Sequence, residues 1–281
     1  MNHRLQSSSS DATELSPNAL MATAKEITAS DGEKIRWVEF GCGRPLVVSP
    51  ALGTPLASWL PALLVLSADF RIFFALTRGG CEGATPKGLA NLTVQRRGKD
   101  LAELINSLDH REYCMVAHSS GVSPAVVSLK QLNTPPSHVC LISARYGAGQ
   151  PIGAEDLLQR ARKDSGFMNV VQSIVVNYSP PSAAGVMREL LRDFGRLEAL
   201  LRAFDLSRTF SYTEPLCAGI AMTFVMAEHD PDDVRKTTRQ IVDAQLGEPW
   251  ALVDVPDVGH FFVQDDGETA AALIATRLSS Q

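Results

Sequence analysis

A serine between small residues follows an apolar run and could act as a nucleophile. The segment Cys114–Val122 reads Cys-Met-Val-Ala-His-Ser-Ser-Gly-Val, so the run ends at Ala117 and Ser119 comes next but one. A strand that turns sharply into a helix lifts such a serine out of a sheet if the residues two before and two after it are small. Ala117 and Gly121 meet that condition. The pattern predicts a nucleophile elbow, although serines before a helix could also act as N-caps.

A serine hydroxyl needs a base to take its proton, and the base needs a carboxylate to orient it. An apolar run over 220–227 leads into Asp230, and the last predicted strand leads through a short loop to His260. Because the carboxyl ends of parallel strands meet at one edge of a sheet, we expect both side chains beside Ser119. The sequence therefore predicts a triad of Ser119, His260 and Asp230.

Each of these assignments has a structural alternative. Asp230 could cap the helix that follows it, although Asp232 or Asp233 suits that position better. His260 could be a buried structural histidine. His118 stands beside the proposed nucleophile, and we expect it to pack under the elbow.

Other polar residues near the strand ends do not suggest a second centre. We expect His229 and Asp257 to be solvated loop residues, and Arg78 to hold its own loop rather than bind substrate. The six histidines show no H-x-x-x-H or similar metal-ligand spacing. No G-x-G-x-x-G follows a predicted strand, so we expect neither a metal nor a cofactor.

Strands and helices alternate along most of the chain, which predicts a mostly parallel sheet with helices on both faces. The expected strands cover 23–29, 34–40, 45–48, 70–76, 113–117, 139–142, 220–227 and 250–255. The expected helices cover 55–66, 92–108 (with Thr93 as the cap), 120–132, 154–163, 184–194, 197–204, 232–246 and 269–278. This is a doubly wound α/β fold with an eight-stranded sheet.

The alternation of strands and helices is interrupted by one long segment, which contains helical patches but no predicted strand. We read 145–213 as a helical cap inserted over the carboxyl edge of the sheet. The core would then consist of 21–144 and 214–281. Residues 1–20 contain a serine run and no apolar stretch, so we expect a disordered tail rather than a signal peptide.

Composition sets further bounds. The 281 residues are 45% hydrophobic and 20% charged, as in ordinary soluble proteins, and the net charge of −5 argues against nucleic-acid binding. No apolar run approaches the roughly 18 residues that a membrane span requires. The five scattered cysteines suggest core residues in a reducing compartment, so we expect a cytoplasmic protein. They are Cys42, Cys81, Cys114, Cys140 and Cys217.

From about Glu26 onward the chain resembles the α/β-hydrolase fold proteins. The similarity lies in the segments Val47–Trp59, Thr77-Arg-Gly-Gly80, Ala117–Gly121, and the pair Ala227–Asp230 and Val258–Phe261. The first is similar to the Ser-x-Ser-Leu-Gly-Thr loop of enol-lactone hydrolases. The order serine, acid, histidine along the chain is also that of the family.

The resemblance implies a role for each residue of the site. Ser119 would be the nucleophile, His260 the general base and Asp230 the orienting carboxylate. The backbone N–H groups of Ser120 and Ala51 would form the oxyanion hole. Loss of one such donor typically raises the barrier by about 3–4 kcal/mol.

The chain departs from the family pattern in two places. Many relatives have His-Gly after the third strand, whereas this chain has Ser49-Pro50. Proline has no N–H, so the hole must use Ala51 or Leu52. The segment Gly80–Gly83 also lacks the histidine and Gly-Ser pattern that is usual there. Neither departure removes a catalytic side chain.

These features predict a serine hydrolase that cleaves a small ester, thioester or lactone through an acyl-enzyme on Ser119. Carbon–carbon bond hydrolysis or a lyase reaction on the same triad is an alternative, as is a ligand-binding homologue without turnover. The segment 145–213 is nearly balanced in charge, which gives no sign of a charged substrate tail. Its apolar residues could line a pocket or form a helix core: Phe167, Met168, Val170, Val171, Ile174 and Val175.

Overall fold

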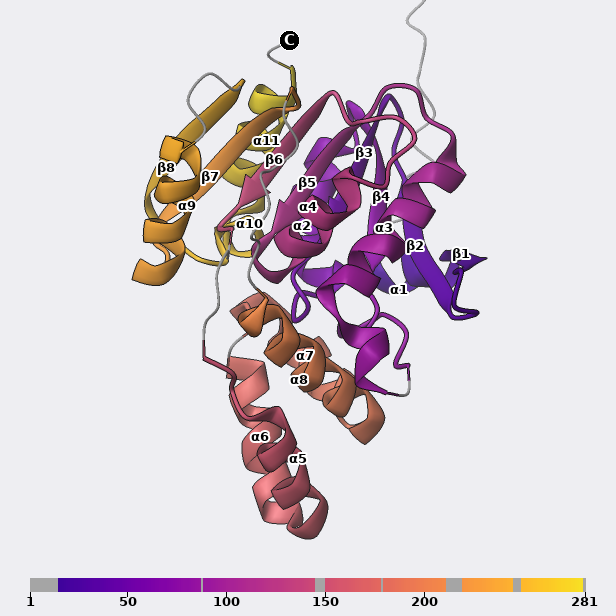
Figure 1. The fold of residues 1–281 in the computed structure, drawn as a ribbon, viewed down its shortest axis with the longest axis vertical. Helices are drawn as coiled ribbons and strands as arrows, with labels where there is room; N and C mark the ends of the chain where they lie inside the picture. The colour runs from indigo at the N-terminus through magenta and orange to yellow at the C-terminus, as the bar shows by residue number, and fades with distance from the viewer. Residues whose placement is uncertain are drawn as a thin grey trace, which may run out of the picture.

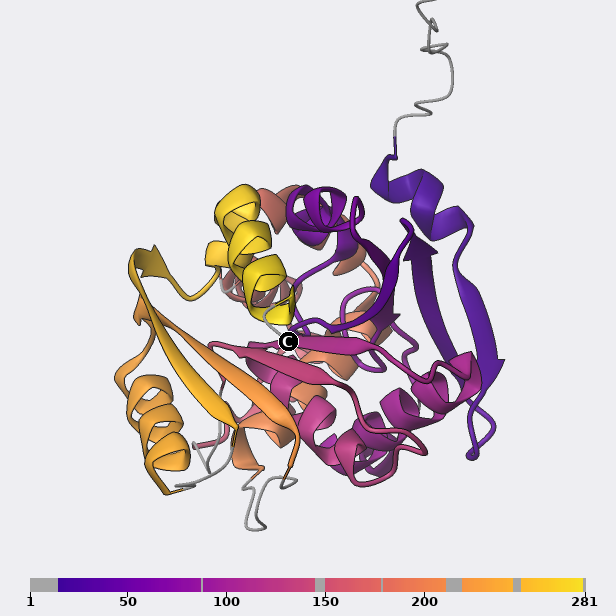
Figure 2. The ribbon, with the colours of Figure 1, turned by 90° about the horizontal axis from the view of Figure 1, so that it is seen from above.

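One eight-stranded sheet organises the molecule. The computed structural model describes residues 15–86, 88–144, 150–177, 179–210, 219–244 and 249–279. The strand order is β1-β2-β4-β3-β5-β6-β7-β8 (Figures 1 and 2). The strands are β1 Lys25–Thr28, β2 Lys34–Phe40, β3 Arg44–Ser49, β4 Phe70–Leu76, β5 Cys114–His118, β6 His138–Ile142, β7 Ala221–His229 and β8 Trp250–Gly259.

The direction of the strands confirms the expected sheet. The pairs β1–β2 and β2–β4 are antiparallel, and every pair from β4 through β3 to β8 is parallel. All residues of the central strands β5 and β6 are buried. Burial on both faces explains why these strands read as continuous apolar runs rather than as alternating patterns.

Helices cover both faces of the sheet, as Figure 2 shows. The helices α2 and α11 pack together on one face, and α3 and α4 pack together on the other. Alternate residues of each strand point to opposite faces and so enter two separate cores. The helices of the sheet region are α1 Pro17–Ala22, α2 Leu56–Leu66, α3 Val94–Leu108, α4 Val122–Leu129, α9 Asp232–Ala244, α10 Phe262–Asp265 and α11 Gly267–Ser279.

Among the described residues, four α-helices lie between β6 and β7 in the sequence and form a separate layer below the sheet region in Figure 1. They enclose a third apolar core, which also includes Leu52 and Leu92 from the sheet region. No strand lies in the described part of 150–210. These helices are α5 Ala154–Lys163, α6 Ser165–Asn177, α7 Ala184–Leu190 and α8 Phe194–Thr209.

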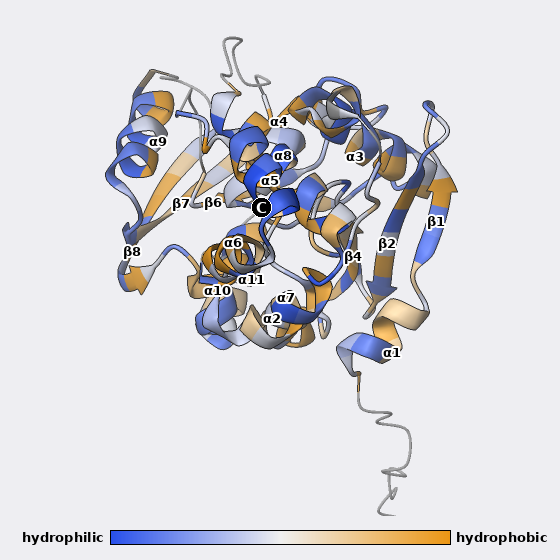
Figure 3. Ribbon diagram, turned by 90° about the horizontal axis from the view of Figure 1, so that it is seen from below, coloured by the Kyte–Doolittle hydropathy of each residue, from blue (hydrophilic) through white to orange (hydrophobic). Residues whose placement is uncertain are grey.

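The distribution of hydrophobic residues matches the layered arrangement of the helices and the sheet. Figure 3 shows hydrophobic residues along β6 and β7, and helices such as α3 and α9 that are hydrophilic on one side only. Thr93 caps α3 by accepting a hydrogen bond from the N–H of Arg96, as expected. No described helix is both long enough and apolar enough to cross a membrane.

Three local expectations need correction. The tail was expected to reach residue 20, but α1 begins at Pro17 after a Ser16 cap, and Leu20 is buried; residues 1–14 lie outside the described residues. The helices α6 and α10 were not expected. The helix after the elbow ends at Leu129 rather than at Leu132.

Candidate active site

The turn after β5 has the geometry of a nucleophile elbow. Ser119 has φ of +50°, in the left-handed region that costs a non-glycine residue about 1–3 kcal/mol. A short 3₁₀ helix, Ser119–Gly121, leads directly into α4. A Cβ atom at Gly121 would lie 2.3 Å from the carbonyl oxygen of Ser49, so only glycine fits there. The strained serine and the required glycine match the predicted motif.

The structure brings the three predicted side chains into one hydrogen-bonded chain. The Oγ atom of Ser119 lies 2.8 Å from Nε2 of His260, and Nδ1 of His260 lies 2.6 Å from Oδ1 of Asp230. The carboxylate can only accept, so Nδ1–H donates to it, and Nε2 is then free to accept from the serine hydroxyl. The side chain of Asp230 is fully buried. Such a chain allows the imidazole to take a proton from the serine.

Ser143, which the sequence pattern does not single out, holds the carboxylate in place. Ser143 follows β6 and has φ of +48°. Its hydroxyl donates to Oδ2 of Asp230 over 2.8 Å, and the N–H of Ala227 donates to the same oxygen over 2.9 Å. Together with His260, these donors fix both carboxylate oxygens. Ser143 stands at the carboxyl end of a central strand, and this position is the sequence signal that could have identified it.

His118 supports the site from below. Its side chain is fully buried, and its Nε2–H donates to the backbone carbonyl of His260 over 2.9 Å. Burial, and then the nearby His260, lower the pKa of His118 to about 3, so the ring is neutral at physiological pH. The residue packs under the elbow as expected, and it also holds the backbone of His260.

The loop after β3 is hydrogen-bonded to the elbow. The N–H of Leu52 donates to Oγ of Ser120 over 3.0 Å, and the hydroxyl of Ser49 donates to the carbonyl of Gly121 over 2.9 Å. Leu52 is therefore occupied, which leaves Ala51 as the donor candidate in this loop. Ala51 and Ser120 both border the cavity in front of Ser119.

A cavity of about 480 Å³ separates the elbow from the helices that follow β6. Ser119 and His260 border it on the sheet side. Three of the six expected apolar residues line it, whereas Val170 is 50% exposed and Phe167 and Met168 pack into the helical core. Its apolar lining from α6 and α8 consists of Val171, Ile174, Val175, Leu200, Leu201 and Phe204.

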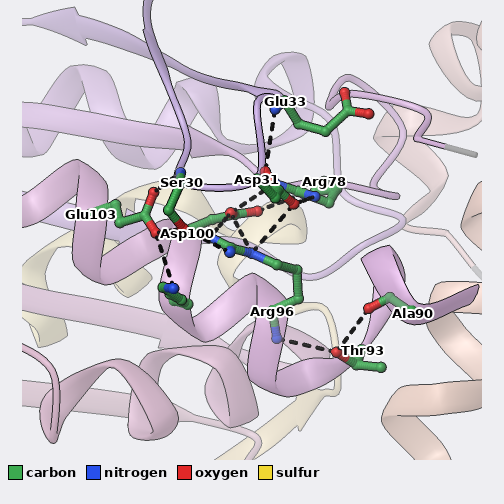
Figure 4. A network of polar contacts seen from close by, with 10 residues as sticks. Ser30, Asp31, Glu33, Arg78, Ala90, Thr93, Arg96, Asp100 and Glu103 are labelled. Carbon is green, nitrogen blue, oxygen red and sulfur yellow. Dashed lines mark hydrogen bonds and ion pairs between the residues drawn. The ribbon is translucent and has the colours of Figure 1, made fainter.

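Arg78 anchors loops, as expected. The guanidinium is only 3% exposed and donates to both carboxylate oxygens of Asp31 and of Asp100. Figure 4 shows Arg96 and Glu103 in the same network. The pKa of Asp31 is lowered to about 2, mainly because Asp31 accepts hydrogen bonds from Arg78. Arg78 is thus committed to structure and does not border the cavity in front of Ser119.

The two remaining polar candidates lie outside the hydrogen-bonded chain. His229 and Asp257 are exposed, as expected, but they belong to the strands β7 and β8 rather than to loops. The N–H of Asp257 donates to the carboxylate of Glu228 over 2.8 Å. Neither residue borders the cavity.

The sequence model of the alpha/beta hydrolase family matches residues 46–273, which is most of the chain. The chain belongs to the alpha/beta hydrolase family. The matched residues include all three members of the hydrogen-bonded chain described above. No curated protein sequence gives a significant match to this alpha/beta hydrolase.

Solved structures of other hydrolases share the fold of this alpha/beta hydrolase. The enol-lactonase from Burkholderia xenovorans LB400 aligns with a TM-score of 0.73 at 18% identity, over 91% of this chain and 100% of that one. A thermophilic esterase from Thermogutta terrifontis aligns with a TM-score of 0.70 at 18% identity, over 91% of this chain and 97% of that one. The epoxide hydrolase VrEH1 from Vigna radiata aligns with a TM-score of 0.68 at 14% identity, over 92% of this chain and 98% of that one. At these identities the likeness is one of fold.

Proposed function

We propose that this alpha/beta hydrolase is a serine hydrolase that cleaves a small ester, thioester or lactone through an acyl-enzyme. The observation that carries the proposal is the hydrogen-bonded chain from Ser119 through His260 to Asp230, which opens onto the cavity. In this proposal the helices of 145–213 act as a cap that covers the acyl site.

The first half of the reaction forms the acyl-enzyme. Nε2 of His260 takes the proton of Ser119 as Oγ attacks the substrate carbonyl carbon. The N–H groups of Ala51 and Ser120 stabilise the oxyanion of the tetrahedral intermediate. The intermediate collapses with cleavage of the carbon–oxygen or carbon–sulfur bond, and the leaving group takes the proton from His260.

The second half releases the acid. A water molecule gives a proton to His260 and attacks the acyl carbon, which re-forms the oxyanion in the same position. Collapse then breaks the bond to Oγ, and His260 returns the proton to Ser119. Asp230 keeps the imidazole in the required tautomer and stabilises its charged form in both halves.

The serine nucleophile favours acyl substrates over epoxides, although several of the structural relatives are epoxide hydrolases. If Ser119 opened an epoxide, the product on the enzyme would be an ether. Water activated by His260 does not cleave an ether at a useful rate. Attack on an acyl carbon instead leaves an ester, which the same base can help to hydrolyse.

The proposal is tested by hydrolysis of a panel of p-nitrophenyl esters, thioesters and lactones. We expect turnover of at least one of them, and a fall in kcat of at least about 10⁴-fold in the Ser119→Ala variant, because the nucleophile is lost. Circular dichroism confirms that the variant is folded.

A serine outside the site provides the control. The hydroxyl of Ser107, in α3, donates to the carbonyl of Leu104, and Ser107 does not border the cavity. The Ser107→Ala variant should keep the wild-type kcat. Equal turnover by wild type and Ser119→Ala would refute the proposed role of Ser119.

A further inference from the structure

One end of the cavity contains positive charge that the rest of its apolar wall lacks. Ser207 and Arg208, near the end of α8, both border the cavity there. Helix α3 packs against α8, and Arg97 of α3 reaches the same place from behind. Arg97 thus reaches Ser207 from α3, and Arg208 is the residue after Ser207 in α8.

Arg97 is a buried cation with unused donors. Its side chain is 2% exposed, and its Nη2 donates to the hydroxyl oxygen of Ser207 over 2.6 Å. Among the described residues, its Nε and Nη1 have no hydrogen-bond partner. Burial lowers the pKa of Arg97 to about 10, so the guanidinium still carries its charge at neutral pH.

No carboxylate of the described residues is paired directly with this charge. The nearest, Asp100, is hydrogen-bonded to Arg78 and Arg96 and affects Arg97 only through its field. A buried charge with unsatisfied donors is costly unless a partner is provided. Arg97 does not border the cavity itself, so an anion bound in the cavity would stabilise this charge through space rather than by a direct hydrogen bond.

Arg208 places a second guanidinium on the wall itself. Its Nε donates to the carbonyl of Gln150 over 2.8 Å, which orients the side chain. Within the described part of the chain, no carboxylate forms an ion pair with it. Asp205 accepts hydrogen bonds from the N–H groups of Ile152 and Ala154, so it is already committed to the loop before α5.

The wall around Arg208 and the elbow border the same cavity. Ser123 lies one helical turn after Ser119 and borders the cavity. Its neighbour Pro124 borders the same small gap as Arg97. Arg97 therefore lies beside α4, and because Ser119 and Arg208 border the same cavity, one substrate can contact both.

We propose that Arg208, with the buried charge of Arg97 behind Ser207, forms a subsite for a carboxylate carried by the substrate. Arg208 binds the carboxylate directly, because a guanidinium matches carboxylate geometry. The Ser207 hydroxyl accepts from Arg97 and donates to the carbonyl of Ala203, so Arg97 contributes through its charge alone, in a buried setting where screening is weak. The preferred substrates are then esters, thioesters or lactones with an anionic tail.

This inference rests on the proposed serine hydrolase function. Two measurements test the subsite and the hydrolase function separately. The first compares kcat/KM for p-nitrophenyl hydrogen adipate and p-nitrophenyl hexanoate, which have the same number of acyl carbons. The second measures binding of monomethyl adipate and dimethyl adipate to the Ser119→Ala protein by calorimetry, which requires no turnover.

We expect the anionic compound to be preferred at least tenfold in both measurements. Arg208→Met should reduce that preference about tenfold, Arg208→Lys should restore part of it, and Arg97→Met should reduce it if that variant folds. The Arg192→Met variant is the control, because Arg192 lies in the same layer, is exposed and pairs with Glu189. It should keep the wild-type preference.

The outcomes distinguish the two ideas. Selective binding of monomethyl adipate without any hydrolysis would support the subsite and refute the hydrolase function. Equal kcat/KM for both esters, or a preference unchanged by Arg208→Met, would overturn the subsite and leave the hydrolase function standing.

Discussion

At the scale of single residues, the site depends on groups that support the three central side chains. Asp230 accepts from His260, Ser143 and Ala227, so its carboxylate cannot rotate without losing hydrogen bonds. His118 fixes the backbone of His260. The positions of Asp230 and His260 are therefore set by the fold itself, and in the proposed mechanism this reduces the cost of reorganisation.

His118 makes the folded protein sensitive to acid. Its pKa is about 3 in the folded state, against about 6.5 in an unfolded chain. Between these values the unfolded chain binds the proton and the folded one does not, so stability falls as the pH drops from about 6.5 towards 3. By pH 5 the loss from this one group is about 2 kcal/mol.

The His118→Asn variant cannot titrate at this position. We expect its free energy of unfolding, measured with urea, to fall less between pH 7 and pH 5 than that of the wild type, by up to about 2 kcal/mol. The other histidines are common to both proteins and cancel in the comparison. Identical pH slopes for the two proteins would show that His118 is not a buried neutral group.

At the scale of elements, the network around Arg78 joins three parts of the chain. Asp31 lies in the turn between β1 and β2, Arg78 in the loop after β4, and Asp100 in α3 (Figure 4). The same loop after β4 meets the active-site loop, because the N–H of Cys81 donates to the carbonyl of Leu52. The network thus holds the framework behind the loop of Ala51, the donor that we propose for the oxyanion hole.

Removing Arg78 would leave Asp31 and Asp100 with Arg96 as their remaining arginine partner. We expect Arg78→Met to lower the free energy of unfolding by about 3–5 kcal/mol, because it breaks a buried ion-pair network from one side. Arg239→Met is the matched control, since Arg239 and Asp254 form a pair that is about half exposed, and its effect should stay below about 1 kcal/mol. Urea unfolding measures both, and similar losses would contradict the anchoring role.

At the scale of the whole molecule, the sequence was informative wherever local pattern and topology agree. Buried parallel strands are apolar runs, so their order and the residues at their carboxyl ends could be predicted. That is why Ser119, Asp230 and His260, distant in sequence, were expected together. The positions of β7 and β8 at one side of β5 then bring them into contact.

Features that depend on tertiary packing could not be predicted. The role of Ser143 requires β6 to lie between β5 and β7, and the charged end of the cavity requires α3 to pack on α8. Helix α6 was missed because its valines and isoleucine favour strands as much as helices. Helix α1 was missed because its Ser16-Pro17 start lies next to a serine-rich segment, although this pair is a regular helix signal.

The central claim is that His260 activates Ser119 as a nucleophile at the carboxyl edge of the sheet. Its most direct test is fluorophosphonate labelling of the folded protein, with the site of the adduct located by peptide mass spectrometry. We predict one adduct, on Ser119, that is absent from Ser119→Ala and strongly reduced in His260→Ala. A folded protein that remains unlabelled, or that is labelled elsewhere, would contradict the claim.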